Sequence, residues 1–94
     1  MSQEQLAARW VLSGRVQGVG FRWYVLRQAE ALDIVGWAAN LPDGRVEVVG
    51  KGTREAIDLF EAALREGPRM SRVENVDKTG IPHEHVHGKM FHIR

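Results

Sequence analysis

Apolar and polar residues alternate in the first part of the chain and then change to a helical period. Residues 9–13 alternate, which predicts a strand with Trp10 and Leu12 on one face. After a glycine-rich segment, an apolar stripe recurs at spacings of four, four and three residues: Phe21, Val25, Ala29 and Leu32. This spacing predicts a helix over residues 21–32. Residues 1–7 are mostly polar, and we expect them to form a frayed N-terminal tail.

Two β-prone runs flank a turn-forming segment in the middle of the chain. The runs at residues 34–40 and 46–51 enclose residues 41–45, Leu-Pro-Asp-Gly-Arg, which are typical of a turn, so we expect a β-hairpin. A second helix is expected to begin after Thr53 and to stop at Gly67. The residues of its buried stripe are Ile57, Phe60 and Leu64.

The remaining strand candidates are weaker and lie at residues 73–78 and 90–94. The elements then follow the order βαββαβ, which predicts an α+β, ferredoxin-like sandwich. In this fold a four- to five-stranded, mainly antiparallel sheet carries both helices on one face. The chain has 94 residues, so we expect residues 1–94 to form a single domain.

Composition narrows the classes of function. The absence of cysteine excludes disulfides, Cys-ligated metal sites and a thiol nucleophile, and it favours a reducing, cytoplasmic compartment. Thirteen Lys and Arg against 12 Asp and Glu give a net charge of +1, which provides no global basic field for nucleic acid or an anionic membrane. We therefore expect a cytoplasmic protein that binds neither, and any anionic ligand must be held locally.

The segment Gly-Arg-Val-Gln-Gly-Val-Gly-Phe-Arg at residues 14–22 joins the first predicted strand to the first predicted helix. Such a loop can direct successive backbone N–H groups inward, and with the positive end of the helix and Arg22 it would form a pocket for a phosphoryl group. The segment has Trp23 where G-x-G-x-x-G requires its third glycine, and the chain has no P-loop motif. From the motif alone, an anion site and a plain turn with a solvated Arg22 both remain open.

Asn40 stands immediately before the predicted turn. An asparagine in this position often only hydrogen-bonds its own backbone, and the residues alone favour that interpretation. Its amide is neutral and cannot act as a general base, but it can accept and donate hydrogen bonds to a water molecule.

The full string at residues 14–22 resembles the signature of the acylphosphatase family, small proteins with a ferredoxin-like fold. The resemblance continues through Gly-Trp-Ala-Ala-Asn at 36–40, the hairpin segment 42–48 and the terminal residues 91–94. It implies an enzyme that hydrolyses small acyl phosphates to a carboxylate and inorganic phosphate, without a metal, a cofactor or a covalent intermediate. It also implies that inorganic phosphate acts as a competitive inhibitor, and we expect a monomer.

The resemblance assigns roles to individual residues. The catalytic arginine of the family falls on Arg22 and the catalytic asparagine on Asn40, which would orient the attacking water. The residues expected to bind the substrate phosphate are Gln17, Gly18, Val19, Gly20, Phe21 and Arg22.

Two positions depart from the family pattern. Asp33 replaces a common glycine after the first helix, and Asp tolerates the left-handed backbone that this position requires. Ala39 replaces a common arginine before Asn40. Because neighbouring side chains of a strand point to opposite faces, we expect Ala39 to face away from Asn40 and to alter affinity without abolishing activity.

The segment 83–87, His-Glu-His-Val-His, contains the zinc-protease motif H-E-x-x-H. Pro82 and Gly88 bracket only five residues, too few for the stable helix that this motif requires. We therefore expect a solvated loop or strand end rather than a catalytic metal site. Three imidazoles on one side of an extended segment (His83, His85 and His87) would at most take up adventitious transition metal.

Two other functions are compatible with this fold. An RNA-binding module is one, but the chain lacks the basic-glycine-aromatic octet of such modules, and we expect Trp10 and Trp37 in the core and Trp23 partly exposed. A non-catalytic module that binds phosphoryl anions in the same pocket is the other. A direct acyl phosphate assay distinguishes both from an enzyme.

Overall fold

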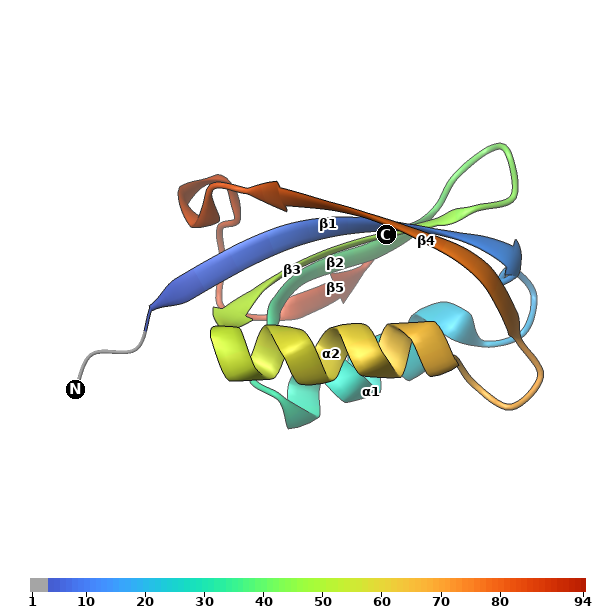
Figure 1. Cartoon of the computed structure of the whole chain (residues 1–94), viewed down its shortest axis with the longest axis horizontal. Helices are drawn as coiled ribbons and strands as arrows, with labels where there is room; N and C mark the ends of the chain where they lie inside the picture. The colour runs from blue at the N-terminus through green and yellow to red at the C-terminus, as the bar shows by residue number, and fades with distance from the viewer. Residues whose placement is uncertain (1–3) are drawn as a thin grey trace.

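Five strands form one sheet, and two helices cover one of its faces, in the computed structural model, which describes residues 4–94 (Figure 1). The strands are β1 (Gln5–Arg15), β2 (Val35–Asn40), β3 (Val46–Thr53), β4 (Arg72–Ile81) and β5 (Phe91–Ile93). The helices are α1 (Phe21–Ala31), α2 (Arg54–Glu66) and a single 3₁₀ turn, η1 (His83–His85). The strand order is β4-β1-β3-β2-β5, so the predicted ferredoxin-like α+β fold is confirmed.

The last two strands occupy opposite edges of the sheet. Strand β4 pairs antiparallel with β1 and completes the βαββαβ order. Strand β5 is a fifth strand that pairs parallel with β2. Most residues of β4 are exposed, because it is an edge strand that the helices barely cover. This exposure explains why its hydrophobic pattern is weak in the sequence.

Strand β1 is longer at both ends than its alternating pattern predicts. The predicted tail at residues 1–7 is wrong for Gln5–Ala7, which belong to β1, while residues 1–3 lie outside the described part of the chain. Gln5 pairs with Thr53 and Ala7 with Lys51, so the long strand β3 supplies the hydrogen-bonding partners that extend β1. These partners are far away in sequence, and the local pattern carries no signal for them.

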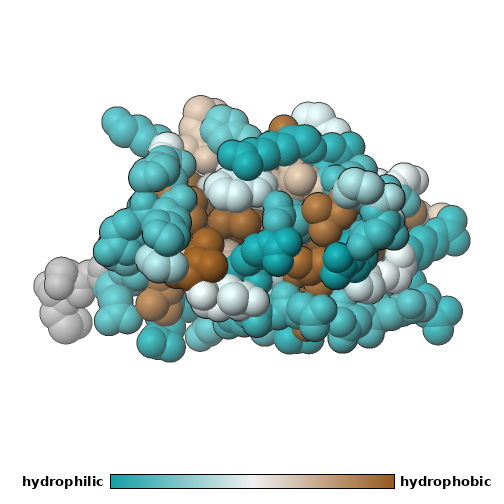
Figure 2. Space-filling view, turned by 90° about the horizontal axis from the view of Figure 1, so that it is seen from above, coloured by the Kyte–Doolittle hydropathy of each residue, from teal (hydrophilic) through white to brown (hydrophobic). Residues whose placement is uncertain are grey.

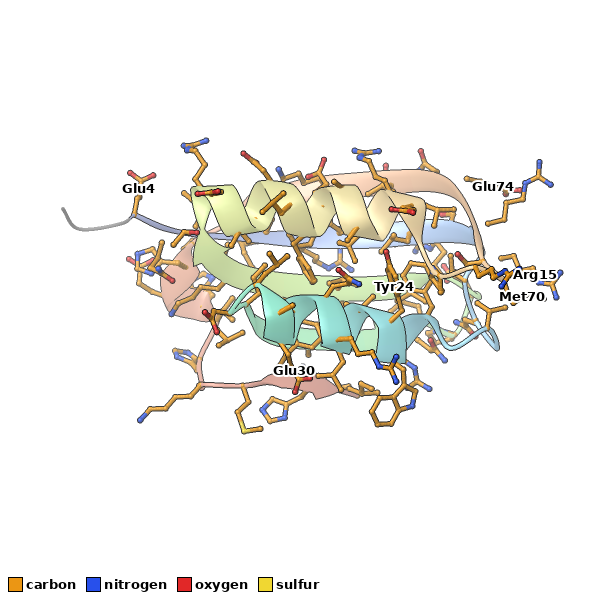
Figure 3. All side chains as sticks on the ribbon, turned by 90° about the horizontal axis from the view of Figure 1, so that it is seen from below. Glu4, Arg15, Tyr24, Glu30, Met70 and Glu74 are labelled. Carbon is orange, nitrogen blue, oxygen red and sulfur yellow. The ribbon has the colours of Figure 1, made fainter. Side chains whose placement is uncertain are left out.

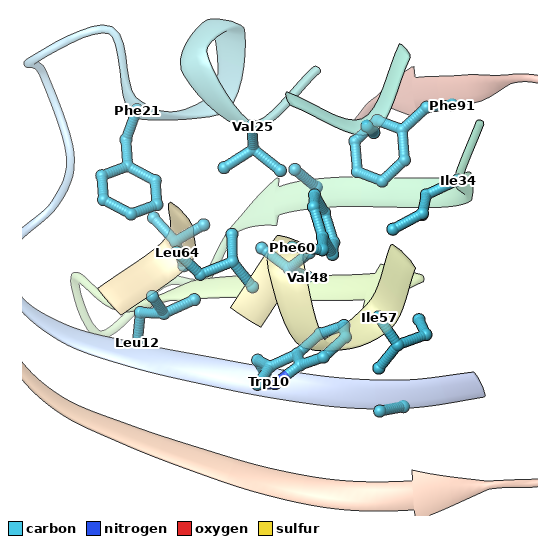
Figure 4. Packing of buried hydrophobic residues seen from close by; sticks show 14 of the residues in the cluster. Trp10, Leu12, Phe21, Val25, Ile34, Val48, Ile57, Phe60, Leu64 and Phe91 are labelled. Atoms are coloured by element: carbon cyan, nitrogen blue, oxygen red, sulfur yellow. The ribbon is translucent and has the colours of Figure 1, made fainter. Parts of the chain in front are cut away.

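The hydrophobic core lies between the sheet and the two helices (Figure 4). Trp10 and Leu12 of β1 are fully buried in it, as predicted. Phe60 of α2 joins the layers, because its ring packs edge-to-face on Trp10 at 5.5 Å and on Phe91 of β5 at 6.0 Å between centroids. Burial of each such side chain stabilises the fold by roughly 1.5–3 kcal/mol.

Neither α1 nor α2 covers the other face of the sheet, which shows a mixture of polar and hydrophobic residues (Figure 2). A small cluster on this face contains Val49, Val86 and Trp37. The prediction that Trp37 is a core residue is therefore wrong: it is only half-buried, and its indole N–H donates to a carboxylate oxygen of Glu47 at 3.3 Å. The alternation of β2 explains this placement, since Ala38, its neighbour, points into the core.

The helix ends follow local signals. Thr53 caps α2 as predicted, because its Oγ1 accepts the N–H of Ala56 at 3.1 Å, and α2 ends before Gly67. Asp33 has φ 56°, so the left-handed conformation expected after α1 is confirmed. No helix within residues 4–94 is long and apolar enough to cross a membrane.

Polar contacts connect the two helices to each other and to the sheet. The Tyr24 hydroxyl of α1, which lies between the helices in Figure 3, donates to the carbonyl of Ala63 in α2 at 2.8 Å. Glu61 of α2 accepts the buried indole N–H of Trp10 at 3.0 Å and pairs with Lys78 of β4 at 2.9 Å. The pKa of the Glu61 carboxyl is lowered to about 2, mainly by the hydrogen bond from Trp10 and to a smaller extent by Lys78.

This shift predicts how stability depends on pH. Because the folded-state pKa of Glu61 lies below that of the unfolded chain, its contribution is present above about pH 4.5 and is lost as the pH falls toward about 2. We expect Glu61→Gln to lower the free energy of unfolding by about 1–2 kcal/mol at pH 6, allowing for solvent screening of this partly exposed group. Urea unfolding of both proteins from pH 6 to 2 should show the difference shrinking, and a constant difference would contradict the prediction.

Candidate active site

The loop between β1 and α1 adopts the conformation that its two glycines permit. Gly18 and Gly20 both have φ 74°, a left-handed conformation that glycine adopts without strain. Helix α1 begins directly after Gly20, with no side chain capping it and no acidic residue in its first turn. The N–H groups from Gly18 to Trp23 have no main-chain hydrogen-bond partner within residues 4–94. These donors and the positive end of α1 together favour an anion.

The Gln17 side chain connects this loop to the β2–β3 turn. Its amide nitrogen donates to the carbonyl oxygens of Leu41 and Arg45, each at 2.9 Å. The turn is braced further because Asp43 accepts the backbone N–H of Arg45 at 3.1 Å, and this hydrogen bond is the main cause of the lowered pKa of the Asp43 carboxyl. Asn40, the last residue of β2, is thereby held beside the loop.

A pocket of about 230 Å³ opens between the loop and the end of β2. The residues that line it are Val16, Gly18, Gly20, Phe21, Arg22, Trp23 and Asn40. Arg22 is the one charged residue among them, and none has a carboxylate or an imidazole. The pocket can therefore attract an anion, but its lining offers no conventional general base.

Arg22 is oriented by the last residue of the chain. Its Nη1 donates to the main-chain oxygen of Arg94 at 2.8 Å. Arg94 is held in turn, because its N–H donates to Ala38 at 2.8 Å and its guanidinium stacks on the Trp37 ring at 3.8 Å. A guanidinium has five N–H donors, so this single bond fixes its direction and leaves donors for a ligand.

A second hollow, of about 320 Å³, lies at the other end of α1 and is lined in part by Glu30, Asp33 and Lys89. The C-terminal end of a helix carries partial negative charge, and two carboxylates add to it here, of which the single cation Lys89 offsets only one. This hollow is larger than the loop pocket but is electrostatically unsuited to a phosphoryl dianion.

The structure brings most of the predicted site residues together. Arg22 and Asn40, which are 18 positions apart in the sequence, line the same pocket with Gly18, Gly20 and Phe21. The side chains of Gln17 and Val19 do not line the pocket: the first binds the turn, and the second packs against the core.

The neighbours of Asn40 show which side chains of β2 lie on each face of the sheet. Ala39 lies on the open face of the sheet, opposite the face to which Ala38 and Asn40 belong, so the prediction that Ala39 points away from Asn40 is confirmed. Sequence reasoning did not identify Arg94 as a partner of Arg22. It lies 72 positions from Arg22, and no local pattern indicates the contact.

The histidine-rich segment forms the 3₁₀ turn η1 on the surface. Because the chain turns here, His83, His85 and His87 do not alternate along an extended strand. The prediction that their three imidazoles lie on one side is therefore wrong. Residues 4–94 contain no group of three or more His, Asp or Glu side chains placed to hold a metal ion.

Known proteins resemble this chain in sequence over most of its length. The family model described as acylphosphatase matches residues 8–93. An acylphosphatase of Koribacter versatilis is 46% identical over 77 residues, covering 82% of this chain and 70% of the relative. One of Thermus thermophilus is 52% identical over 67 residues, covering 71% of this chain and 76% of the relative.

A solved structure shows the same likeness. The crystal structure of acylphosphatase from Bacillus subtilis superimposes with a TM-score of 0.88 at 37% identity, covering 95% of this chain and 98% of that one. The family model, the sequence relatives and the solved structure all indicate the same family. The chain therefore belongs to the acylphosphatase family.

Proposed function

We propose that the protein hydrolyses the carboxyl–phosphate bond of small acyl phosphates in the pocket between the β1–α1 loop and Asn40. The observation that carries this proposal is the meeting of three features in one pocket: the unpartnered N–H groups of the loop, the Arg22 guanidinium and the Asn40 amide. Each supplies something that phosphoryl transfer requires, namely anion binding, charge stabilisation and orientation of the nucleophile.

The loop and Arg22 would bind the phosphoryl end of the substrate. The N–H groups from Gly18 to Trp23 can donate to its oxygens, and the free donors of Arg22 add charge-assisted hydrogen bonds. Charge spreads over these oxygens in the transition state, so donors that are already oriented stabilise it without further rearrangement. The bond from Arg22 to Arg94 supports this role because it sets the guanidinium direction before substrate binds.

Asn40 would orient the attacking water. Its amide accepts one hydrogen bond from water and donates another, which can hold the water oxygen in line with the bond to be broken. The new bond forms between this oxygen and phosphorus, while the phosphorus–oxygen bond to the acyl group breaks and its electron pair leaves on the carboxylate. A phosphoryl oxygen of the substrate takes the water's proton, which agrees with the absence of a carboxylate or imidazole from the lining.

Further properties belong to the same proposal. Inorganic phosphate, the product, should compete with substrate for the loop. The reaction should need no metal ion or cofactor, because the lining has no carboxylate, imidazole or thiolate to hold a metal ion. We also propose a cytoplasmic monomer that binds neither nucleic acid nor membranes, in keeping with its lack of cysteine and its net charge of +1.

Hydrolysis of benzoyl phosphate by the purified protein tests this proposal. We expect catalytic turnover, followed by the loss of substrate absorbance, with the same rate in the presence and absence of EDTA. Inorganic phosphate should inhibit competitively. Binding of phosphate without turnover would instead indicate a non-catalytic phosphoryl-binding module, and loss of turnover in EDTA would show a metal-dependent hydrolase.

A further inference from the structure

Trp23 is a large aromatic side chain that stands exposed at the mouth of the pocket. It lies in the first turn of α1 and lines the same pocket as Arg22 and Asn40, yet 65% of its surface is accessible to solvent. Three other large hydrophobic side chains of residues 4–94 are comparably exposed: Leu59, Met70 and Met90. None of these three lines that pocket, so Trp23 differs from them in its position.

The fold itself makes no evident use of the Trp23 ring. The buried side of α1 carries Phe21, Val25 and Ala29, and a residue two positions after Phe21 points about 200° around the helix, away from the core. The indoles of Trp10 and Trp37 both donate to carboxylates, and each lies near a cationic side chain. Within residues 4–94, the Trp23 ring has no aromatic or cationic partner.

The substrate of the proposed reaction has two chemically different ends. Its charged phosphoryl group belongs with the loop donors and Arg22, and its acyl group must then extend away from them. Of the large apolar residues in the lining, Val16 and Phe21 are 1% and 2% exposed, so little of their surface can meet a ligand. Trp23 is the apolar side chain of the lining with a large accessible surface.

We propose that Trp23 binds the acyl group of the substrate and gives the enzyme a preference for aromatic or bulky apolar acyl phosphates over acetyl phosphate. This inference rests on the proposed hydrolase function. An indole ring offers a wide flat face that packs on a planar aromatic acyl group, whereas a methyl group covers little of it. Contacts of this kind discriminate by roughly tenfold, as do other single apolar contacts in binding pockets.

The ratio of kcat/KM for benzoyl phosphate to kcat/KM for acetyl phosphate tests this inference. We expect Trp23→Ala to lower this ratio by about fivefold to tenfold relative to the original protein. Trp23→Phe, which retains an aromatic face, should keep the ratio within about twofold. Leu59→Ala, a matched removal of an exposed apolar side chain that is 52% accessible on α2, should leave the ratio unchanged.

Inhibition constants give a second readout that does not depend on turnover. The probes are phenacylphosphonate and acetonylphosphonate, in which a CH₂ group replaces the bridging oxygen of benzoyl and acetyl phosphate. The original protein should bind the phenyl compound more tightly, and Trp23→Ala should lose most of that preference. Circular dichroism should show the same folded state for each variant.

The kinetic results distinguish failure of this inference from failure of the proposed function. If the original protein hydrolyses neither substrate, the proposed function fails. If it hydrolyses both and Trp23→Ala leaves the ratio unchanged, Trp23 is not the acyl-binding residue and the inference alone is overturned. An equal loss in Trp23→Phe, or in Leu59→Ala, would also overturn it, because neither result requires an aromatic contact at the pocket.

Discussion

Asn40→Ala is expected to fold normally and to lower kcat for benzoyl phosphate by about 100-fold or more. Asn40 is exposed at the end of β2, so its removal leaves no cavity in the core and should change stability little. The loss in kcat follows from the role proposed for the amide, since no other side chain in the lining can accept a hydrogen bond from the water. Single oriented hydrogen-bonding groups contribute about 10²–10³-fold in other enzymes. Steady-state kinetics and thermal unfolding check both parts.

The controls for Asn40 separate water positioning from phosphate binding. The inhibition constant of inorganic phosphate should change only slightly in Asn40→Ala, because the loop N–H groups and Arg22 remain. Asn75→Ala removes an exposed asparagine from β4, away from the lining of the pocket, and should keep full activity. If Asn40→Ala retained near-full kcat, Asn40 would be a turn residue only, which is the alternative that its sequence context favours.

Arg22→Ala is expected to weaken inorganic phosphate binding and to lower kcat/KM by about 10³-fold. Arg22 is the one cation in the lining of the pocket, and its guanidinium is already directed by Arg94. In the proposed mechanism, the substitution removes attraction for the bound phosphate and also the stabilisation of charge in the transition state. Arginine groups that perform this task in phosphoryl transfer contribute about 10³–10⁵-fold. Competitive inhibition by phosphate and initial rates measure the two effects separately.

Two further arginine substitutions act as controls. Arg22→Lys keeps the charge but not the planar fork, so we expect it to restore phosphate binding only in part. Arg27→Ala removes an exposed arginine from the same helix, outside the pocket lining, and should leave both measurements within about twofold. If Arg22→Ala left the phosphate inhibition constant unchanged, Arg22 would not belong to the phosphate site.

The elements with strong local signals are those for which the sequence prediction holds. Helix α2 carries a complete set of local signals: a capping Thr53, an apolar stripe and a stop at Gly67. Each of them acts within a few residues of the chain. The β1–α1 loop is similar, because the left-handed conformations of Gly18 and Gly20 depend on the glycines themselves. The resemblance to a family then added the roles of Arg22 and Asn40, which motif logic alone left open.

The contacts that tertiary structure decided all join distant parts of the chain. Strand β1 reaches Gln5 because β3 offers hydrogen-bonding partners there, and Arg22 is oriented by Arg94 across 72 positions. Trp37 faces the open side because Ala38, its neighbour in β2, takes the place in the core. Local periodicity shows which residues share a face, but it does not show which face the helices cover or which strand lies alongside. Packing of the whole chain settles both, and with them the position of Asn40 beside the β1–α1 loop.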